Sequence, residues 1–299
     1  MKEQGNGWIQ LTDDSFFQDF DGNFDNKIFR SSTGAFEHQT YDTRLSIKYA
    51  ISGGDEYYRF EGKDHCIPPG HFMIVNPKET VLSRNLESRQ TEGLSIFIAE
   101  SMLKEVIQSH RIAAFHIEPF YPDDSPVPHF LEQITPAGDS AFGRFIAGLS
   151  SGPPQYSNWE ELFFELSCSL IQSQVGYWRR LHLIQAVKAS TRIELHNRLE
   201  RARAFMLDNI GRPLSLDDIS RAACLSKYAL VRAFKAAYGM SPYQFFLSKK
   251  IEHSKQLLRL GRPIAEVAYQ LGFADHAAFG KRFVKETGLT PSAYREAVS

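Results

Sequence analysis

The residues with the clearest chemical potential are cationic and aromatic side chains that recur at helical spacing in the last third of the chain. On a helix that begins after Ser226, one exposed side is predicted to present Lys227, Tyr228, Val231, Arg232 and Lys235. Arginine can bond a guanine through two parallel hydrogen bonds, tyrosine can contact a thymine methyl group or a phosphate, and lysine suits phosphates. We therefore expect this helix to lie in the major groove of DNA, with Arg232 reading a base.

A second set of side chains with similar spacing but poorer hydrogen-bonding capacity follows further along the chain. Its groove-facing members are predicted to be His276, Ala277, Gly280 and Lys281, with Arg282 and Lys285 directed toward phosphates. Of the groove-facing four, His276 and Lys281 alone can bond bases, and Gly280 weakens a helix by about 1 kcal/mol relative to alanine. We expect this second helix to read sequence more weakly, mostly through DNA shape and backbone contacts.

Both sets belong to one helix-turn-helix pattern that occurs twice. The first copy runs from Ile219 through Phe234 to Pro242, and the second from Val267 through Phe283 to Pro291. The leading helices match at an offset of 48 residues and the second helices at 49, because the second turn is one residue longer. Such a repeat indicates two similar small helical units in tandem.

Helix boundary signals support this arrangement. Ser215 with Asp218 three residues later forms an approximate capping box, Ser226 and Asp275 are good N-caps, and Gly272 suits the left-handed end of a helix. Between the two units, Ser241-Pro242 is predicted to open a helix that continues to about Leu260 and closes at Gly261 and Pro263. Such a helix spans roughly 28 Å, close to the roughly 34 Å that separates successive major grooves on one face of DNA. It is therefore predicted to act as a rigid spacer.

The charge of the chain is divided unequally around residue 192. The whole chain has a formal net charge of −1, but residues 192–299 carry 18 Lys and Arg against 10 Asp and Glu, whereas residues 1–191 carry 16 against 25. A basic surface attracts the phosphate backbone and an acidic surface is repelled by it. The C-terminal part is thus suited to nucleic acid and the N-terminal part is not.

The N-terminal part is predicted to be an α+β domain of residues 1–185, with strands at about 24–100 and helices at about 101–180. Leu45, Ile47 and Tyr49 alternate with polar residues as in a half-buried strand, and short strands with Gly and Pro turns suggest a small barrel or jelly roll. A helix from about residue 158 to 178 has an apolar face that either packs within the subunit or pairs with a second copy in a dimer. Residues 186–191 are polar and are predicted to be the linker to an all-α domain of residues 192–299.

The C-terminal region resembles the AraC-type (AraC/XylS) family of transcription regulators. The resemblance runs from Leu195 to Arg295 and rests on the two helix-turn-helix units, the linking helix, Gly272-Phe273, and the Gly-Leu-Thr-Pro ending at 288–291 followed by Tyr294-Arg295. Lys250 stands where the family commonly has arginine, and Ser254 where alanine is common. The resemblance implies a regulator that binds double-stranded promoter DNA, with RNA polymerase as a possible further partner.

The N-terminal part looks like the cupin-type effector and dimerisation domain of that family, through residues 67–70 and 76–77. This implies a cupin-like barrel that holds an unidentified small-molecule effector, and a homodimer formed through the helices that follow. Polar or aromatic residues predicted to face the barrel lumen are the candidate effector ligands: His38, Arg44, Tyr49, Tyr57 and Arg59. An alternative is that the N-terminal domain serves only to dimerise or to contact another protein.

Catalysis is the weakest alternative, because no set of residues suits it. The chain lacks a His-x-His pair, turns or strands separate His38, His65 and His71, and the three cysteines are scattered. We expect no enzyme activity, no metal and no cofactor. No apolar run approaches 18 residues and Met1–Gln10 lacks the form of a signal peptide, so we expect a cytoplasmic protein that makes no contact with a membrane.

Overall fold

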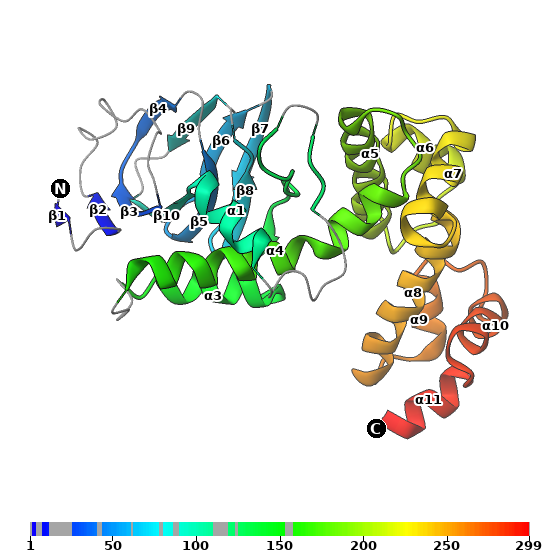
Figure 1. Ribbon diagram of the computed structural model, residues 1–299. Coiled ribbons are helices and arrows are strands. Elements are labelled where there is room, and N and C mark those ends of the chain that lie inside the picture. The colour runs from blue at the N-terminus through cyan, green and yellow to red at the C-terminus, as the bar shows by residue number, and fades with distance from the viewer. Residues whose placement is uncertain are drawn as a thin grey trace. The chain divides into compact units, whose positions relative to one another are not determined.

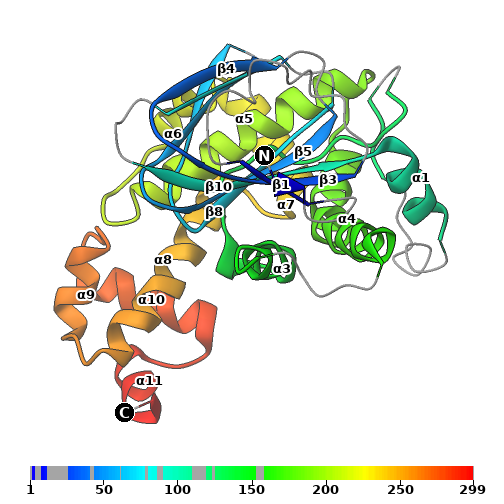
Figure 2. The same cartoon turned by 90° about the vertical axis from the view of Figure 1, so that its left-hand side faces the viewer.

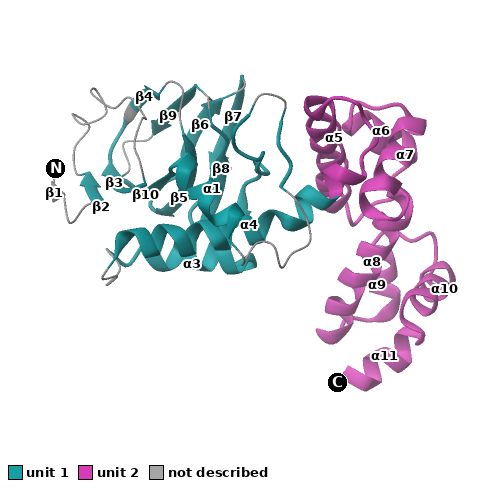
Figure 3. Ribbon diagram, viewed as in Figure 1, with its two compact units in different colours: residues 1–179 teal, residues 180–299 magenta. Residues whose placement is uncertain are grey.

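The chain divides into two compact units, residues 1–179 and 180–299, which are described separately (Figure 3). The computed structural model describes residues 2–3, 8–11, 26–40, 44–60, 62–77, 80–85, 90–109, 119–122, 125–152 and 158–298. The boundary between the units falls within helix α4 (Trp159–Leu183). The last turn of this helix belongs to the second unit, as do residues 186–191, where the sequence places a linker.

The first unit contains two β-sheets and several helices (Figure 1). The larger sheet has the strand order β1 (Lys2–Glu3), β2 (Trp8–Leu11), β3 (Lys27–Thr33), β10 (Thr91–Ile98), β5 (Leu45–Ser52), β8 (His71–Val75) and β11 (Thr135–Pro136). The smaller sheet has the order β4 (Phe36–Thr40), β9 (Val81–Asn85), β6 (Glu56–Phe60) and β7 (Lys63–Ile67). All neighbouring strands are antiparallel except β2 and β3.

The two sheets pack face to face through alternate residues of their strands. Ala50, Met73 and Val75 of the larger sheet form one buried cluster with Tyr58 and Phe60 of the smaller sheet. The predicted cupin-like barrel is not confirmed. The sheets are not closed, because no hydrogen-bonded ladder joins the two sheets among the described strands. The predicted mixed α+β architecture is confirmed. Alternation along a strand predicts which side chains share a face, but it does not predict which strand edges pair, so it could not establish closure of a barrel.

Helices cover the other face of the larger sheet. They are α1 (Glu100–Gln108), the short 3-10 helix η2 (Ala137–Asp139), α3 (Ala141–Leu149) and the first part of α4. Phe142 of α3 packs edge-on against Phe72 of β8, with 5.5 Å between ring centroids, and both views show α3 and α4 along this side of the sheet (Figures 1 and 2). The central strand β5 is therefore buried on both of its faces.

The apolar face of helix α4 packs within the subunit, the first of the two arrangements considered from the sequence. Leu162, Phe163, Leu166, Leu170 and Ile171 are buried within the chain itself. Because they already pack inside the subunit, these side chains are not exposed for pairing with a second copy.

The second unit is all-helical and contains α5 (Ala189–Asp208), α6 (Leu216–Ala222), α7 (Lys227–Tyr238), α8 (Pro242–Arg259), α9 (Ile264–Gln270), α10 (His276–Thr287) and α11 (Pro291–Val298). Its two cores correspond to the two copies of the sequence repeat. Ile219 and Phe234 lie in the first core, and Val267 and Phe283 in the second. Helix α8 contributes to both, through Phe245 and Phe246 to the first and through Ile251 and Leu258 to the second. Among the described helices, none has both the length and the apolar character that spanning a bilayer requires.

Candidate nucleic-acid interface and inter-sheet pocket

The first helix-turn-helix begins and ends at the residues that the sequence indicates. The Ser215 hydroxyl accepts a hydrogen bond from the Asp218 backbone N–H at 3.2 Å, and the Asp218 carboxylate accepts one from the Ser215 N–H at 3.0 Å, which completes a capping box. Ser226 caps α7 by accepting from the Ala229 N–H at 3.2 Å. Gly239 ends that helix in the left-handed conformation, with φ of 73°.

Helix α7 buries one face and exposes the other. Leu230, Ala233, Phe234 and Ala237 are buried in the first core, whereas the predicted DNA-facing residues Lys227, Tyr228, Arg232 and Lys235 are exposed and Val231 is half-buried. The Tyr228 side chain is 76% exposed, and the Arg232 guanidinium lies 5.9 Å from its ring centroid. Lys227 forms an ion pair with Asp217 at 2.9 Å, but both groups are exposed, so the pair contributes little and leaves the lysine available.

Helix α10 repeats this arrangement with fewer hydrogen-bonding groups. The Asp275 carboxylate caps it by accepting from the Ala278 N–H at 2.6 Å, and Phe279 and Phe283 are buried. The predicted DNA-facing residues His276, Ala277, Lys281 and Lys285 are exposed and Gly280 is half-buried. A Cβ atom built on Gly280 would meet no atom within 4 Å. The chain therefore has space for a side chain at this position and carries none.

Arg282 is less accessible than its neighbours on α10. Its side chain is 17% exposed and forms an ion pair with Glu286 at 2.6 Å. A phosphate contact by Arg282 requires this pair to rearrange, whereas Lys285 needs no such change.

The two turns of the repeat share an unusual backbone conformation. Gly272 has φ of 63°, and Cys224, which occupies the equivalent position of the first unit, has φ of 51°. A Cβ atom on Gly272 would lie 2.9 Å from the Arg212 carbonyl carbon, so this position needs glycine both for its conformation and for space. Cys224 is exposed and adopts the left-handed conformation as a non-glycine residue, which costs about 1–2 kcal/mol.

Lys250 of α8 connects the loop before the first helix-turn-helix to the turn of the second. Its ammonium donates to the carbonyl oxygens of Arg212, at 3.0 Å, and Leu271, at 2.5 Å, and the residue is 3% exposed. The ammonium also lies 4.5 Å from the ring centroid of Phe246 and 5.6 Å from that of Phe273. Burial lowers the pKa of Lys250 to about 8. One side chain of the spacer helix thus holds backbone segments of both helix-turn-helix units.

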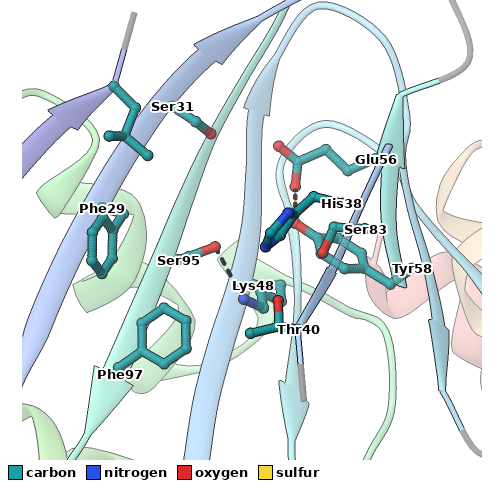
Figure 4. Close-up of a pocket in the computed structure, with 11 residues that line it drawn as sticks. Phe29, Ser31, His38, Thr40, Lys48, Glu56, Tyr58, Ser83, Ser95 and Phe97 are labelled. Carbon is teal, nitrogen blue, oxygen red and sulfur yellow. Dashed lines mark hydrogen bonds between the residues drawn. The ribbon is translucent and has the colours of Figure 1, made fainter. Parts of the chain in front are cut away.

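The first unit contains a pocket between the two sheets (Figure 4). About 500 Å³ of space lies between its walls, part of it open to solvent. Strands of both sheets contribute to its wall, whose residues are Leu11, Phe29, Ser31, His38, Thr40, Lys48, Glu56, Tyr58, Ser83, Ser95 and Phe97. The wall therefore combines an apolar side with a dense set of hydrogen-bonding groups.

Lys48 places an ammonium group deep in this pocket. The residue is 6% exposed, and its Nζ donates to the Ser95 hydroxyl at 3.2 Å. The same Nζ lies 4.6 Å from the ring centroid of Phe97 and 5.7 Å from that of Tyr58. Burial lowers the pKa of Lys48 to about 8, and the nearby Glu56 charge opposes this shift.

Glu56 places a carboxylate on the opposite wall. It accepts a hydrogen bond from the Tyr58 hydroxyl at 2.7 Å. Burial raises the pKa of Glu56 to about 7, against the opposing effects of the Tyr58 hydrogen bond and the Lys48 charge. Gly93 makes room for this carboxylate, because a Cβ atom there would lie 2.0 Å from Glu56 Oε1. Among the interactions of the described residues, no ion pair joins Lys48 to Glu56.

Comparison with known proteins places the C-terminal region in a family. Residues 219–297 match the model of a family described as a helix-turn-helix domain. The chain is 37% identical over 101 residues to the MmsAB operon regulatory protein of Pseudomonas aeruginosa, covering 33% of each protein. It is 25% identical over 229 residues to the uncharacterized HTH-type transcriptional regulator YbfI of Bacillus subtilis, covering 76% of each. Residues 219–297 form an AraC-type helix-turn-helix domain.

Among solved structures, an AraC-type regulator from Chromobacterium violaceum shares 28% identity, with a TM-score of 0.33. The match covers 35% of this chain and 94% of that one. The matches span a third of the MmsAB regulator and about three quarters of YbfI. The first unit of this chain lies outside the matched helix-turn-helix domain.

The pocket contains one of the residues expected to hold an effector. His38 of β4 lines it (Figure 4). Tyr57 and Arg59 lie on the other face of β6 from Glu56 and Tyr58, and Arg59 forms a surface ion pair with Asp64 at 2.9 Å. Tyr49 is buried on the helix-covered face of β5, and Arg44 precedes that strand; neither lines the pocket.

Sequence reasoning missed Lys48, Glu56 and Tyr58 because it assumed the wrong inward face. In β5 the apolar residues Leu45 and Ile47 face the helices, while Lys48 faces the second sheet. The available signal was Lys48 itself, a charged residue within a strand whose apolar side chains face the helices. In the described part of the chain, no three His, Cys, Asp or Glu side chains gather as metal ligands do.

Proposed function

We propose that this protein is a transcription regulator that binds promoter DNA through residues 192–299. Helices α7 and α10 enter successive major grooves, and α8 holds them apart. Helix α8 has 18 residues and a length of about 27 Å, which approaches the roughly 34 Å between grooves, and bending of the DNA closes the difference. The observation that carries the proposal is the repeated exposed cationic helix, set in an AraC-type domain and in the basic part of an otherwise acidic chain.

The two helices contribute differently to recognition in this proposal. Arg232 and Tyr228 read base edges from α7, while Lys227 and Lys235 contact phosphates. On α10, His276 and Lys281 contact bases, Lys285 and Arg282 contact phosphates, and Ala277 and Gly280 allow close approach. The regulator acts as a homodimer at its promoter, where RNA polymerase is its expected neighbour.

The first unit makes this regulator responsive to a small-molecule effector that occupies the inter-sheet pocket. The support is that Lys48 and Glu56 line this pocket, because burying ionisable groups costs folding free energy and such groups are common at functional sites. His38, Lys48, Glu56 and Tyr58 are the proposed contacts.

A mobility-shift assay with the full-length protein and genomic fragments tests DNA recognition. Arg232→Ala is expected to weaken binding by about 1–3 kcal/mol and to relax preference at one base. Lys235→Ala on the same helix is the matched comparison, since a phosphate contact weakens all sequences alike and reduces the salt dependence by about one counterion. A protein that prefers no genomic fragment over random competitor contradicts the proposal, and an Arg232→Ala effect that is equal for every sequence reduces Arg232 to a phosphate contact.

A further inference from the structure

The inter-sheet pocket contains two opposite charges that do not neutralise each other. Lys48 and Glu56 lie on facing sheets and feel each other's charge, yet no ion pair joins them (Figure 4). Among the described residues, the Lys48 ammonium has one hydrogen-bond acceptor, the Ser95 hydroxyl, although an ammonium can donate three bonds. Within the described part of the chain, the Glu56 carboxylate has one hydrogen-bond donor, Tyr58, although it can accept several. Both groups thus have hydrogen-bonding capacity left for a ligand.

The charges restrict which ligand satisfies both groups. A simple carboxylate pairs with Lys48 but leaves the buried Glu56 charge next to a second anion. A simple amine pairs with Glu56 but leaves the buried Lys48 charge next to a second cation. A neutral polyol supplies hydrogen bonds but compensates neither charge, and a buried charge is stabilised most by a hydrogen-bonded partner of opposite sign.

The remaining wall of the pocket limits the rest of the ligand. Leu11, Phe29 and Phe97 form an apolar side, and Phe29 and Phe97 meet edge-on with 5.6 Å between their ring centroids. Ser31 of β3, Thr40 of β4 and Ser83 of β9 add hydroxyl groups. A compact molecule with charged groups and a short carbon chain fits this combination of surfaces.

We propose that the pocket binds a small zwitterion, a free amino acid or an amino carboxylate of similar size. Its carboxylate accepts hydrogen bonds from Lys48 and Ser95, and its ammonium donates to Glu56. The carbon chain lies against Phe29 and Phe97. This inference rests on the proposed effector function of the first unit and specifies the chemistry of its ligand.

The test uses full-length protein and defined compounds. Thermal-shift screening and calorimetry are carried out at pH 7.5 with the twenty proteinogenic amino acids, β-alanine and γ-aminobutyrate, and with simple carboxylates, amines and sugars for comparison. We expect at least one to raise Tm and to bind with a measurable Kd. The N-acetyl derivative and the carboxamide of that compound each remove one charge, and each is expected to bind at least tenfold more weakly.

Variants connect the binding to the two charged groups. Lys48→Met and Glu56→Gln are each expected to weaken binding of the responding compound at least tenfold. Arg59→Gln, on the outward face of the same strand as Glu56, is the matched control and is expected to leave the Kd unchanged. If the pocket variants fail to fold, the derivative series on the wild-type protein still decides the outcome.

The possible failures are distinguishable. If simple carboxylates, amines or sugars bind and no amino carboxylate does, the ligand class is wrong and the effector pocket stands. If the N-acetyl and carboxamide derivatives bind as tightly as the parent compound, charge pairing is refuted. If no compound of any class binds while promoter DNA is still recognised, both the ligand class and the effector role fail, and the DNA-binding proposal survives.

Discussion

Replacing Lys250 by methionine tests whether one buried side chain fixes the relation between the two helix-turn-helix units. Methionine keeps the length and apolar stem of lysine but removes the donor to the Arg212 and Leu271 carbonyls. A hydrogen bond from a charged group contributes about 1.5–3 kcal/mol, and the contact with Phe246 adds about 0.5–2 kcal/mol. The variant no longer buries an ammonium, which offsets part of this loss. We expect a net destabilisation of about 2 kcal/mol.

The effect on DNA binding follows from the position of the two carbonyls. Arg212 precedes α6 and Leu271 follows α9, so loss of the shared donor loosens each unit against α8. A mobile pair of units binds its operator more weakly and tolerates altered spacing between half-sites. If loosening costs about 1.4 kcal/mol in binding, affinity falls about tenfold.

Two measurements check this prediction. Urea unfolding followed by far-ultraviolet circular dichroism gives the stability, and mobility shifts on the cognate operator and on operators lengthened or shortened by one base pair give the spacing preference. Lys249→Met is the matched control, because Lys249 is the neighbouring residue and forms a surface ion pair with Glu252 at 2.6 Å. Lys250→Arg is expected to retain the spacing preference. If Lys250→Met matches Lys249→Met in both assays, the connecting role of Lys250 is refuted.

Two further predictions concern Gly280 and Glu56. Gly280→Ala is expected to stabilise the protein by about 1 kcal/mol, since no atom within 4 Å obstructs the new methyl group. The same substitution is expected to weaken operator binding if α10 approaches DNA closely. Thermal unfolding measures the first effect and mobility shifts the second, and an unchanged operator affinity would contradict close approach. Glu56 has its pKa raised from 4.5 to about 7 by burial, so its contribution to stability is complete below about pH 4.5 and is lost as the pH rises through 7. Glu56→Gln is therefore expected to gain stability relative to the wild-type protein as the pH rises from 5 to 7, as measured by Tm. The nearby groups Lys48, Tyr58 and His38 are present in both proteins. A difference in Tm that is independent of pH would show that Glu56 does not titrate in this range.

The helix-turn-helix domain was predictable because its signals are local. The capping box of Ser215 and Asp218, the left-handed turn at Gly272 and the proline that opens α8 each act within a few residues. The heptad-like spacing of Leu230, Phe234 and Ala237 identifies the buried face of α7 directly. Positions and exposure of the α7 and α10 side chains agree with the sequence pattern, and their contacts with DNA stay a prediction.

The two-sheet fold and its pocket depend on pairings between distant segments. Lys48 donates a hydrogen bond to Ser95, and Glu56 lies against Gly93, both on the distant strand β10. The residues next to Lys48 and Glu56 in the sequence do not indicate these partners. In β5 the apolar alternation correctly indicated a strand, but both faces are buried, so alternation did not distinguish the helix-covered face from the pocket face. In β6, choosing the wrong face as the pocket side selects Tyr57 instead of Glu56 and Tyr58, because successive side chains point to opposite faces of a strand.

Gly93 controls the space available to the Glu56 carboxylate. A Cβ atom at this position would lie 2.0 Å from Glu56 Oε1, the end of a flexible side chain, so a larger residue at 93 would require the carboxylate to move. A methyl group at 93 would therefore displace the Glu56 carboxylate and alter the pocket from a position whose own side chain does not line it.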